Sequence, residues 1–267
     1  MYNFREYVQV ETIEEAFELK KKRGNRIIAG GLWLRLGGNK SFNIAIDLSK
    51  LGLDTIEEKE DEFVIGCMTP LRKLETDKNF IQWFDAIPGK AVSSIVGTQF
   101  RNTATVGGSI YGRFGFSDVL TVFLALETYV EMHEGGMIPL EKFAQMPYDK
   151  DILVNLHVKK NKGRAAYESL RLTSTDFPIM TAAGSCIDGK WRIVVGARPK
   201  RARMIDATTI LGKNPGEEEI NQLLEEVQKM HFDSNKLASE EYRRAMADVL
   251  VKRVIRQILE AEIWSYQ

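Results

Sequence analysis

Two Gly-Gly pairs, each closing an apolar strand, constrain this chain more than any other feature. The pairs are Gly30-Gly31 and Gly107-Gly108. Glycine lacks a Cβ atom, so the backbone at such a pair bends sharply and approaches a ligand with its N–H groups exposed. Two such turns on separate elements are suited to grip one pyrophosphate from two sides. Neither pair lies in a G-x-G-x-x-G or G-x-x-x-x-G-K-[ST] phosphate loop, and either pair alone is also what an ordinary tight turn requires.

Size and charge limit the possible partners. The 267 residues, with 37 basic and 37 acidic side chains, suffice for one multi-part domain or two domains. A protein that tracks nucleic acid usually has a basic surplus, so we expect no nucleic-acid partner. No stretch approaches the roughly 20 apolar residues of a membrane span, and the N-terminus lacks the pattern of a signal peptide. We therefore expect a cytoplasmic protein.

The cysteines and histidines offer no site of their own. Cys67 and Cys186 lie in apolar segments without metal-ligand spacing and are typical of buried thiols in a reducing compartment. We expect neither an iron–sulfur nor a zinc site in this chain. His133, His157 and His231 do not adjoin a glycine pair, and we expect no catalytic acid–base residue.

Hydrophobic periodicity divides the chain into three parts, 1–53, 54–163 and 164–267, each mixing helix and strand. In the first part, Thr12 and Glu15 form a capping box that opens a helix. The later predicted strands are 55–58, 63–68, 129–132, 152–158, 166–172, 179–186 and 191–197. One later predicted helix begins at Thr69-Pro70, and the others cover 80–88, 119–126, 217–230 and 240–263. The pattern predicts an α+β chain, not a doubly wound sheet.

Three motifs, taken in order, resemble the FAD-binding (medium) subunit of the molybdenum hydroxylases, the family of xanthine dehydrogenase and carbon monoxide dehydrogenase flavoproteins. They are Ala29–Gly31 after a strand, Arg101–Ile110 followed by Asp118, and Ala238–Arg244 near the C-terminus. Arg171–Phe177 also matches the third part of the family. The resemblance implies a two-part FAD-binding domain of the vanillyl-alcohol-oxidase (PCMH) type, followed by a C-terminal α+β domain with a small antiparallel sheet and helices.

The resemblance further implies one noncovalent FAD, with its pyrophosphate between the first two parts and its isoalloxazine ring facing the third. Such subunits relay electrons from [2Fe-2S] clusters on one partner subunit, through FAD, to NAD or another acceptor. The molybdenum cofactor is carried by a further subunit. The cofactor-binding residues implied in this chain are Ile28, Ala29, Gly30, Gly31, Leu32, Trp33, Leu34, Ile95, Thr105, Gly107, Gly108, Ser109, Asp118 and Ile179.

The chain departs from the family pattern in both loops. The family usually has a hydroxyl residue and then a polar one after the first glycine pair, where this chain has Leu32 and Trp33. Hydrogen bonds from those side chains are lost, although backbone donors remain. In the second loop, Arg113–Phe116 replaces a stretch of small residues. Phe114 or Phe116 would either stack near the flavin ring or belong to the core.

Several residues have two possible roles. The carboxylate of Asp118 suits a ribose hydroxyl, a helix N-cap, or both. Ile95 and Ile179 fall where the family places apolar residues near the flavin, but strand residues of this type usually form core. The run Arg198–Arg203 either attracts an anionic nucleotide such as NAD or is solvated.

Two other functions fit parts of the sequence. A flavin oxidase of the vanillyl-alcohol-oxidase type shares the broad architecture, but it often attaches FAD through His or Cys and has a longer substrate domain. A flavin-free assembly subunit would keep the fold and lose the cofactor, and only Leu32-Trp33 favours it.

Overall fold

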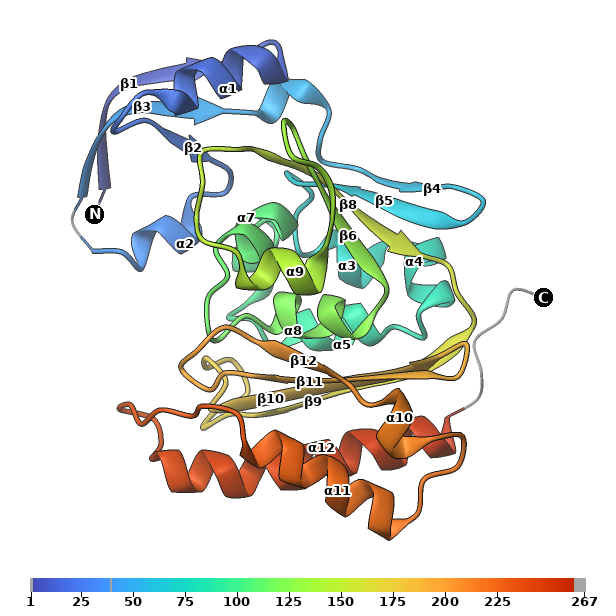
Figure 1. Ribbon diagram of the computed structural model, residues 1–267. Coiled ribbons are helices and arrows are strands. Elements are labelled where there is room, and N and C mark those ends of the chain that lie inside the picture. The colour runs from blue at the N-terminus through green and yellow to red at the C-terminus, as the bar shows by residue number, and fades with distance from the viewer. Residues whose placement is uncertain (1, 39, 262–267) are drawn as a thin grey trace.

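A computed structural model describes residues 2–38 and 40–261 and places the chain in three layers, each with its own β-sheet (Figure 1). The first layer is a three-stranded parallel sheet in the order β1-β3-β2. Its elements are β1 (Tyr2–Gln9), α1 (Ile13–Lys21), β2 (Arg26–Ile28), α2 (Leu32–Arg35), β3 (Lys40–Asp47) and the 3₁₀ turn η1 (Ser49–Leu51). Thr12 caps α1, as predicted, because its hydroxyl accepts the N–H of Glu15.

The second layer is a five-stranded antiparallel sheet in the order β4-β5-β8-β6-β7, covered by short helices. Its strands are β4 (Ile56–Glu58), β5 (Glu62–Gly66), β6 (Thr128–Met132), β7 (Gly136–Pro139) and β8 (Leu153–Lys159). Its helices are α3 (Lys73–Thr76), α4 (Lys78–Trp83), α5 (Ile87–Ser93), α6 (Thr98–Arg101), α7 (Val106–Tyr111), α8 (Asp118–Ala125) and α9 (Leu140–Gln145).

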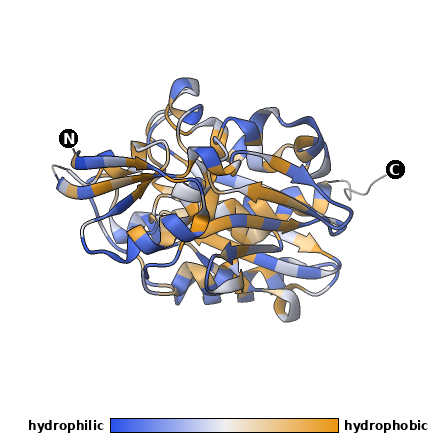
Figure 2. Cartoon of the chain, turned by 90° about the horizontal axis from the view of Figure 1, so that it is seen from above, coloured by the Kyte–Doolittle hydropathy of each residue, from blue (hydrophilic) through white to orange (hydrophobic). Residues whose placement is uncertain are grey.

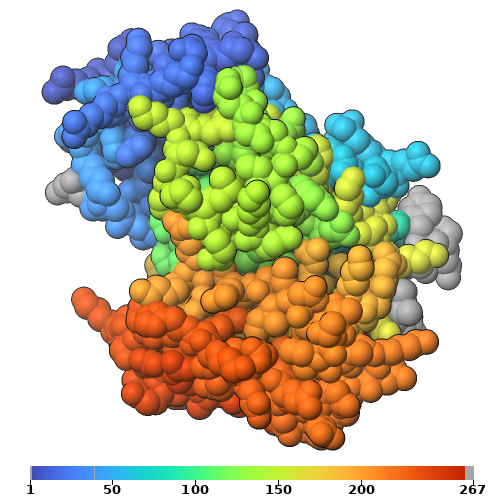
Figure 3. Space-filling view, viewed as in Figure 1, coloured from blue at the N-terminus to red at the C-terminus, as the bar shows by residue number. Residues whose placement is uncertain are grey.

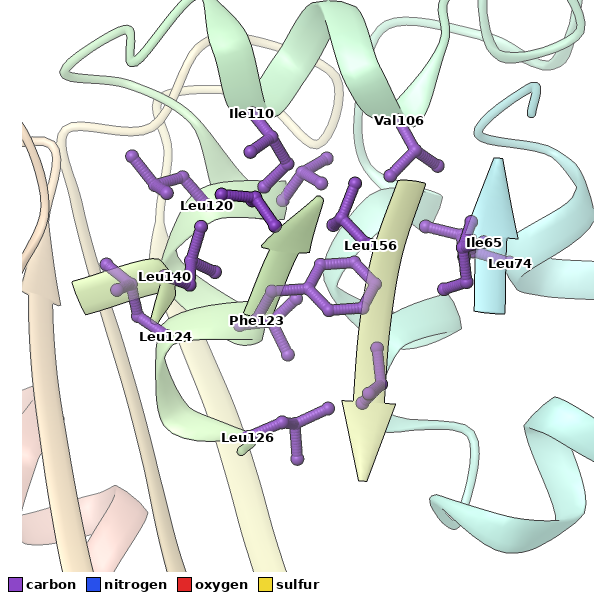
Figure 4. Close-up of a cluster of buried hydrophobic side chains, with 14 of the residues drawn as sticks. Ile65, Leu74, Val106, Ile110, Leu120, Phe123, Leu124, Leu126, Leu140 and Leu156 are labelled. Atoms are coloured by element: carbon purple, nitrogen blue, oxygen red, sulfur yellow. The ribbon is translucent and has the colours of Figure 1, made fainter. Parts of the chain in front are cut away.

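Helix α8 lies at the centre of the molecule. All eight of its residues are buried, which fits its nearly uniform apolar sequence, because a helix that is hydrophobic all round must be covered all round. Ser117 caps it by accepting the N–H of Leu120. On one side, Phe123 and Leu124 face a cluster that includes Leu156 of β8 (Figure 4). The other side of α8 faces the third layer.

The third layer is a four-stranded antiparallel sheet in the order β12-β11-β10-β9, followed by helices. Its elements are β9 (Gly163–Leu170), β10 (Met180–Ile187), β11 (Lys190–Gly196), β12 (Arg203–Asp206), α10 (Thr208–Leu211), α11 (Glu217–Gln228) and α12 (Glu240–Glu260). The predicted hairpin at Asp188-Gly189 is confirmed, since both residues have positive φ between the paired strands β10 and β11. Figure 3 shows this layer, in orange and red, as a continuous slab below the other two.

Both faces of the third sheet are buried. In β11, Val194 packs with the core of α8, whereas Ile193 and Val195 point to the opposite core under α11 and α12. This alternation follows from the two-residue side-chain period of a strand. Three polar contacts join the described residues of the sheet to α8: the hydroxyls of Thr121 and Thr181 lie 3.1 Å apart, Ser185 donates to the carbonyl of Ala125, and Tyr167 donates to Asp118. The third layer therefore covers the second layer's core.

Two helix predictions are wrong: the helix start at Thr69-Pro70 and the single helix over 80–88. Thr69-Pro70 opens no helix, because the Thr69 hydroxyl donates to the Thr55 carbonyl, Pro70 pairs with Thr105 in a β-bridge, and α3 begins only at Lys73. The segment 80–88 is not one helix. Asp85 and Ala86 have φ of 49° and 57°, which breaks the chain between α4 and α5.

Hydrophobic segments gather toward the middle of the molecule, and hydrophilic segments occupy its outer helices and loops (Figure 2). Among the helices in the described ranges, none is both long and apolar enough to cross a membrane. The predicted extension of α12 to residue 263 runs into residues outside the described ranges.

Candidate functional site

The segments that carry the two glycine pairs lie against each other. A Cβ added at Gly30 would overlap the backbone carbonyl of Thr103, lying 2.5 Å from its carbon and closer still to its oxygen. A Cβ added at Gly108 would lie 3.4 Å from the indole of Trp33. The absence of a Cβ atom at Gly30 therefore lets the loop after β2 dock on the loop before α7, and Gly108 lies in ordinary contact range of Trp33. The sequence brings both predicted loops to one place.

A cavity of about 450 Å³, here called the loop cavity, opens between the two loops. That volume falls within the roughly 300–1,000 Å³ of small-molecule clefts. Nine of the residues expected to bind a cofactor line it: Ala29, Gly30, Gly31, Leu32, Trp33, Leu34, Thr105, Gly107 and Gly108. The cavity is apolar over most of its wall, with a few charged groups at one end.

The first loop leaves backbone donors for a ligand. Gly31 has φ of 70°, a left-handed value that favours glycine, and it is the N-cap of α2. It has no side chain to bond the amides that follow. The first amides of a helix have no partner within it, so the N–H groups of Leu32, Trp33 and Leu34 need other acceptors.

The second glycine pair differs from the sequence-based interpretation, because it lies in the first turn of α7 and does not close a strand. Its amides already have acceptors within the chain: Gly107 donates to the Cys67 carbonyl at 2.9 Å, and Gly108 donates to the Thr105 hydroxyl at 3.1 Å. A Cβ at Gly107 would lie 2.5 Å from that Cys67 carbonyl oxygen. Gly107 is therefore required by packing inside the protein, whether or not a ligand approaches.

The hydroxyls of Thr105 and Ser109 differ in whether they have a hydrogen-bond donor left for a ligand. A hydroxyl carries a single O–H donor. Ser109 uses its donor on the Thr105 carbonyl at 2.9 Å and accepts the indole N–H of Trp33 at 3.0 Å. The Thr105 hydroxyl accepts the Gly108 amide and keeps its own proton to donate. Of the two hydroxyls, Thr105 is the one with a donor left for a ligand in the loop cavity.

A second compartment, here called the aromatic compartment, lies between the second and third layers. It is lined by Trp33, Ile95, Val96, Ser109, Phe114, Phe116, Ser117, Asp118, Val119, Arg171, Thr175, Asp176 and Phe177, and it holds only about 10 Å³ of free space. The rings of Phe114 and Phe116 stack with centroids 5.3 Å apart, and Phe177 lies 4.5 Å from Phe116. Trp33 and Phe114 line both spaces.

Asp118 is held by the protein itself. Its carboxylate accepts from the hydroxyl of Tyr167 and from the guanidinium of Arg171, and its side chain is 4% exposed. Burial raises the pKa of Asp118 to about 6, against the opposing charge of Arg171. Ser117, not Asp118, caps the helix. Asp118 thus links the second layer to the third.

Two of the expected residues lie outside both spaces. Ile28 is half-buried in β2. Ile179 is buried in the core beneath the third sheet, and its carbonyl accepts from the buried guanidinium of Arg243. The basic run is only partly solvated, since Arg198 is buried and donates to the carbonyls of His231 and Arg201.

Sequence reasoning missed the charged end of the loop cavity. Lys20 on α1 donates to the hydroxyl of Tyr111 at 2.9 Å and to the carbonyl of Asp151 at 2.8 Å. Burial lowers the pKa of Lys20 to about 8. Arg26 and Asp149 line the same end. Nothing in the local pattern distinguishes Lys20 from its neighbours on α1; only the tertiary contact with Tyr111 identifies it.

Comparisons with known proteins agree with this arrangement. A family model described as the FAD binding domain in molybdopterin dehydrogenase matches residues 2–158. The uncharacterized protein YgfM of Escherichia coli (strain K12) is 27% identical over 186 residues, which are 68% of this chain and 70% of YgfM. The xanthine dehydrogenase FAD-binding subunit of Escherichia coli O157:H7 is 25% identical over an alignment of 287 positions, which covers 98% of each chain.

Solved structures share the fold along the whole chain. A chain of the carbon monoxide dehydrogenase from Hydrogenophaga pseudoflava that lacks the Mo-pyranopterin moiety has a TM-score of 0.86 and 22% identity, covering 96% of this chain and 97% of the other. A chain of quinoline 2-oxidoreductase from Pseudomonas putida 86 has a TM-score of 0.82 and 18% identity, covering 97% and 96%. The predicted α+β fold is confirmed.

Proposed function

Because the chain belongs to the family described as the FAD binding domain in molybdopterin dehydrogenase, we propose that it relays electrons from [2Fe-2S] clusters on a partner subunit, through its FAD, to a separate acceptor. The observation that carries this proposal is the loop cavity between the two glycine pairs. The cavity joins the first two layers, and the aromatic compartment beyond it faces the third.

The residues of the loop cavity fit the diphosphate and adenosine of FAD. The wall formed by Gly30 and Gly31 packs closely against its neighbours, since a Cβ at Gly30 would overlap Thr103 and one at Gly31 would overlap the hydroxyl of Tyr2. We assign the diphosphate to the first amides of α2 and to the hydroxyl of Thr105. Lys20 has three N–H donors, two of which are used, so one is left for the adenosine end.

The remaining proposed contacts are less direct. Gly107 and Gly108 shape the wall of the loop cavity, and Ser109 lines the aromatic compartment, rather than donate to the ligand. Ile95 and Asp118 belong to the side where the isoalloxazine ring would lie, with Asp118 acting through Arg171 and Tyr167. Bound FAD supplies the chemistry that accepts and passes on electrons. The protein residues bind it, orient it and exclude water.

We further propose that the chain works as one subunit among three, beside an iron–sulfur subunit and a molybdenum-cofactor subunit, and that its three parts are 1–53, 54–163 and 164–267. A relative supports the subunit role: the alpha subunit of the 6-hydroxypseudooxynicotine dehydrogenase complex of Paenarthrobacter nicotinovorans is 27% identical over 194 residues, which are 67% of this chain and 65% of that subunit. Affinity purification from the native host should recover both partners. A lone chain that oxidises a small substrate at enzyme-like rates would contradict the proposal.

NAD is the acceptor that we propose. The test is stopped-flow reoxidation of the reduced flavin with NAD, a quinone and oxygen in separate experiments. Faster reoxidation by NAD supports the assignment, whereas faster reoxidation by the quinone or by oxygen overturns it.

A second candidate function is a flavin-free assembly subunit, which the nearly filled aromatic compartment favours. The ultraviolet-visible spectrum of the purified chain separates the two candidates. Flavin absorption bands that are released on denaturation, with a stoichiometry near one per chain, support noncovalent FAD. A chain that shows no flavin bands and does not take up added FAD would be the assembly subunit.

A further inference from the structure

The two halves of the site differ sharply in free space, and this inference rests on the placement of FAD proposed above. The loop cavity offers about 450 Å³, but the aromatic compartment offers about 10 Å³. A single buried water needs roughly 10–15 Å³. The structure as it stands therefore has room for the adenosine and diphosphate of FAD but not for an isoalloxazine ring.

Trp33 divides the two spaces. It lines both of them. Its indole N–H donates to the Ser109 hydroxyl at 3.0 Å, and its ring contacts Phe100 edge-on with centroids 5.2 Å apart. The rings of Phe114 and Phe116 each lie 5.9 Å from it. Trp33 thus lies, together with Phe114, between the part of the site that is open and the part that is filled.

The segment that carries Trp33 is short and lies between two glycines in left-handed backbone. Gly31 and Gly38, both with positive φ, stand on either side of the four-residue helix α2, and Leu36 beyond it is 51% exposed. Because glycine adopts a wide range of backbone angles, these two positions are where the backbone would accommodate a movement of the Trp33 side chain. The Phe114 ring packs closely against Gly112.

We propose that Trp33 is a gate that discriminates among adenosine nucleotides. Nucleotides that end at the diphosphate, such as ADP, bind the loop cavity while Trp33 stays in place. FAD binds fully only when the indole leaves Ser109 and the aromatic rings, so that the isoalloxazine ring takes the space. FAD binding then has two steps, and ADP binding has one.

The gate has a kinetic signature. If Trp33 must swing before the ring enters, the observed rate of FAD binding levels off at high FAD concentration, because gate opening becomes limiting. The rate of ADP binding rises linearly with ADP concentration. The hydrogen bond from Trp33 to Ser109 and the contacts of Trp33 with the aromatic rings together set the height of the barrier to gate opening.

The test measures FAD and ADP binding to the flavin-free full chain by stopped-flow fluorescence, in the wild type and in Trp33→Ala. Losing the hydrogen bond and an aromatic contact should raise the limiting rate of FAD binding by about tenfold or more. The rate of ADP binding should still rise linearly with ADP concentration in both proteins. Ser109→Ala removes the acceptor of the indole N–H, together with the donor to the Thr105 carbonyl, and should raise the same limiting rate by about 2- to 12-fold. Trp83→Phe, on α4 away from both spaces, is the matched control and should change neither ligand's kinetics.

The outcomes separate the gate from the cofactor placement. If the wild type binds neither FAD nor ADP, the proposed placement of FAD fails and the gate fails with it. If FAD binds without a limiting rate, or Trp33→Ala weakens FAD binding while ADP binds normally, Trp33 is not a gate but the cofactor placement stands. Circular dichroism reports folding. If Trp33→Ala does not fold, Ser109→Ala decides: an unchanged limiting rate overturns the gate.

Discussion

Replacing Gly30 by alanine tests whether the two loops can pack against each other only because residue 30 has no methyl group. The added Cβ would lie 2.5 Å from the Thr103 carbonyl carbon, and an ordinary contact is about 3.4 Å. The obstacle is backbone rather than a flexible side-chain end. The loops would have to separate by about 1 Å or more, or the alanine would have to distort its own backbone.

The expected loss of stability follows from this overlap. Forcing an extra carbon into a packed site costs about 1–3 kcal/mol. In a domain of 150–250 residues, each kcal/mol lowers the melting temperature by about 2–4 °C. We therefore expect Gly30→Ala to lower the Tm by about 2–12 °C and to reduce the FAD content of the purified chain, since the loops that frame the cavity move apart.

Differential scanning calorimetry and the flavin absorbance per chain measure both effects. The control is Gly97→Ala, because a Cβ there meets nothing within 4 Å and Gly97 has extended backbone with φ of −141°. Its expected penalty is that of a weaker helix cap, at most about 1 kcal/mol. If Gly30→Ala melts no lower than Gly97→Ala and retains full FAD, the docking of the two loops does not depend on Gly30.

Three further changes test other parts of the structure. Gly107→Val should impair folding, and not only flavin binding, because its Cβ would press on the Cys67 carbonyl; a wild-type melting curve would contradict this. Arg171→Met should destabilise the chain by about 3–5 kcal/mol, because it leaves the buried Asp118 charge without its arginine partner. Denaturant titration measures the loss, and an effect smaller than that of an exposed control such as Arg256→Met would refute the prediction. Burial lowers the pKa of Lys20 to about 8 from 10.5. Between about pH 8 and pH 10.5 the unfolded chain therefore binds more protons than the folded chain, and the free energy of unfolding should rise with pH. Lys20→Met should remove that rise, and an identical pH profile in the variant would exclude Lys20 as its source.

Local signals predicted the elements whose causes are local. The N-cap at Thr12, the hairpin at Asp188-Gly189 and the amphipathic α11 all depend on residues close in sequence, and the structure has them. The predicted capping box is only half formed, because the Glu15 carboxylate accepts the N–H of Glu11 and not that of Thr12. The break at Asp85 and Ala86 escaped prediction because neither residue is glycine, the usual signal for positive φ.

The site was predictable in its position but not in its contacts. The glycine pairs and the family resemblance located the loop cavity. They did not reveal that Gly107 is required by Cys67, because that contact joins α7 to the end of β5 across the fold. Nor did the sequence place the indole of Trp33 between two spaces, since the position of a side chain at the end of a short helix depends on Ser109 and on rings brought in by other segments.

The burial of α8 on every side has a consequence for how this protein can be divided. The match to the family model ends at residue 158, just before the strand that starts the third sheet at Gly163. A fragment cut at that point would keep the whole loop cavity yet leave bare the side of α8 that Val194 and Thr181 now cover. The homology boundary is therefore not a boundary of autonomous folding. Any layer that replaced the third one would have to cover the same side of α8.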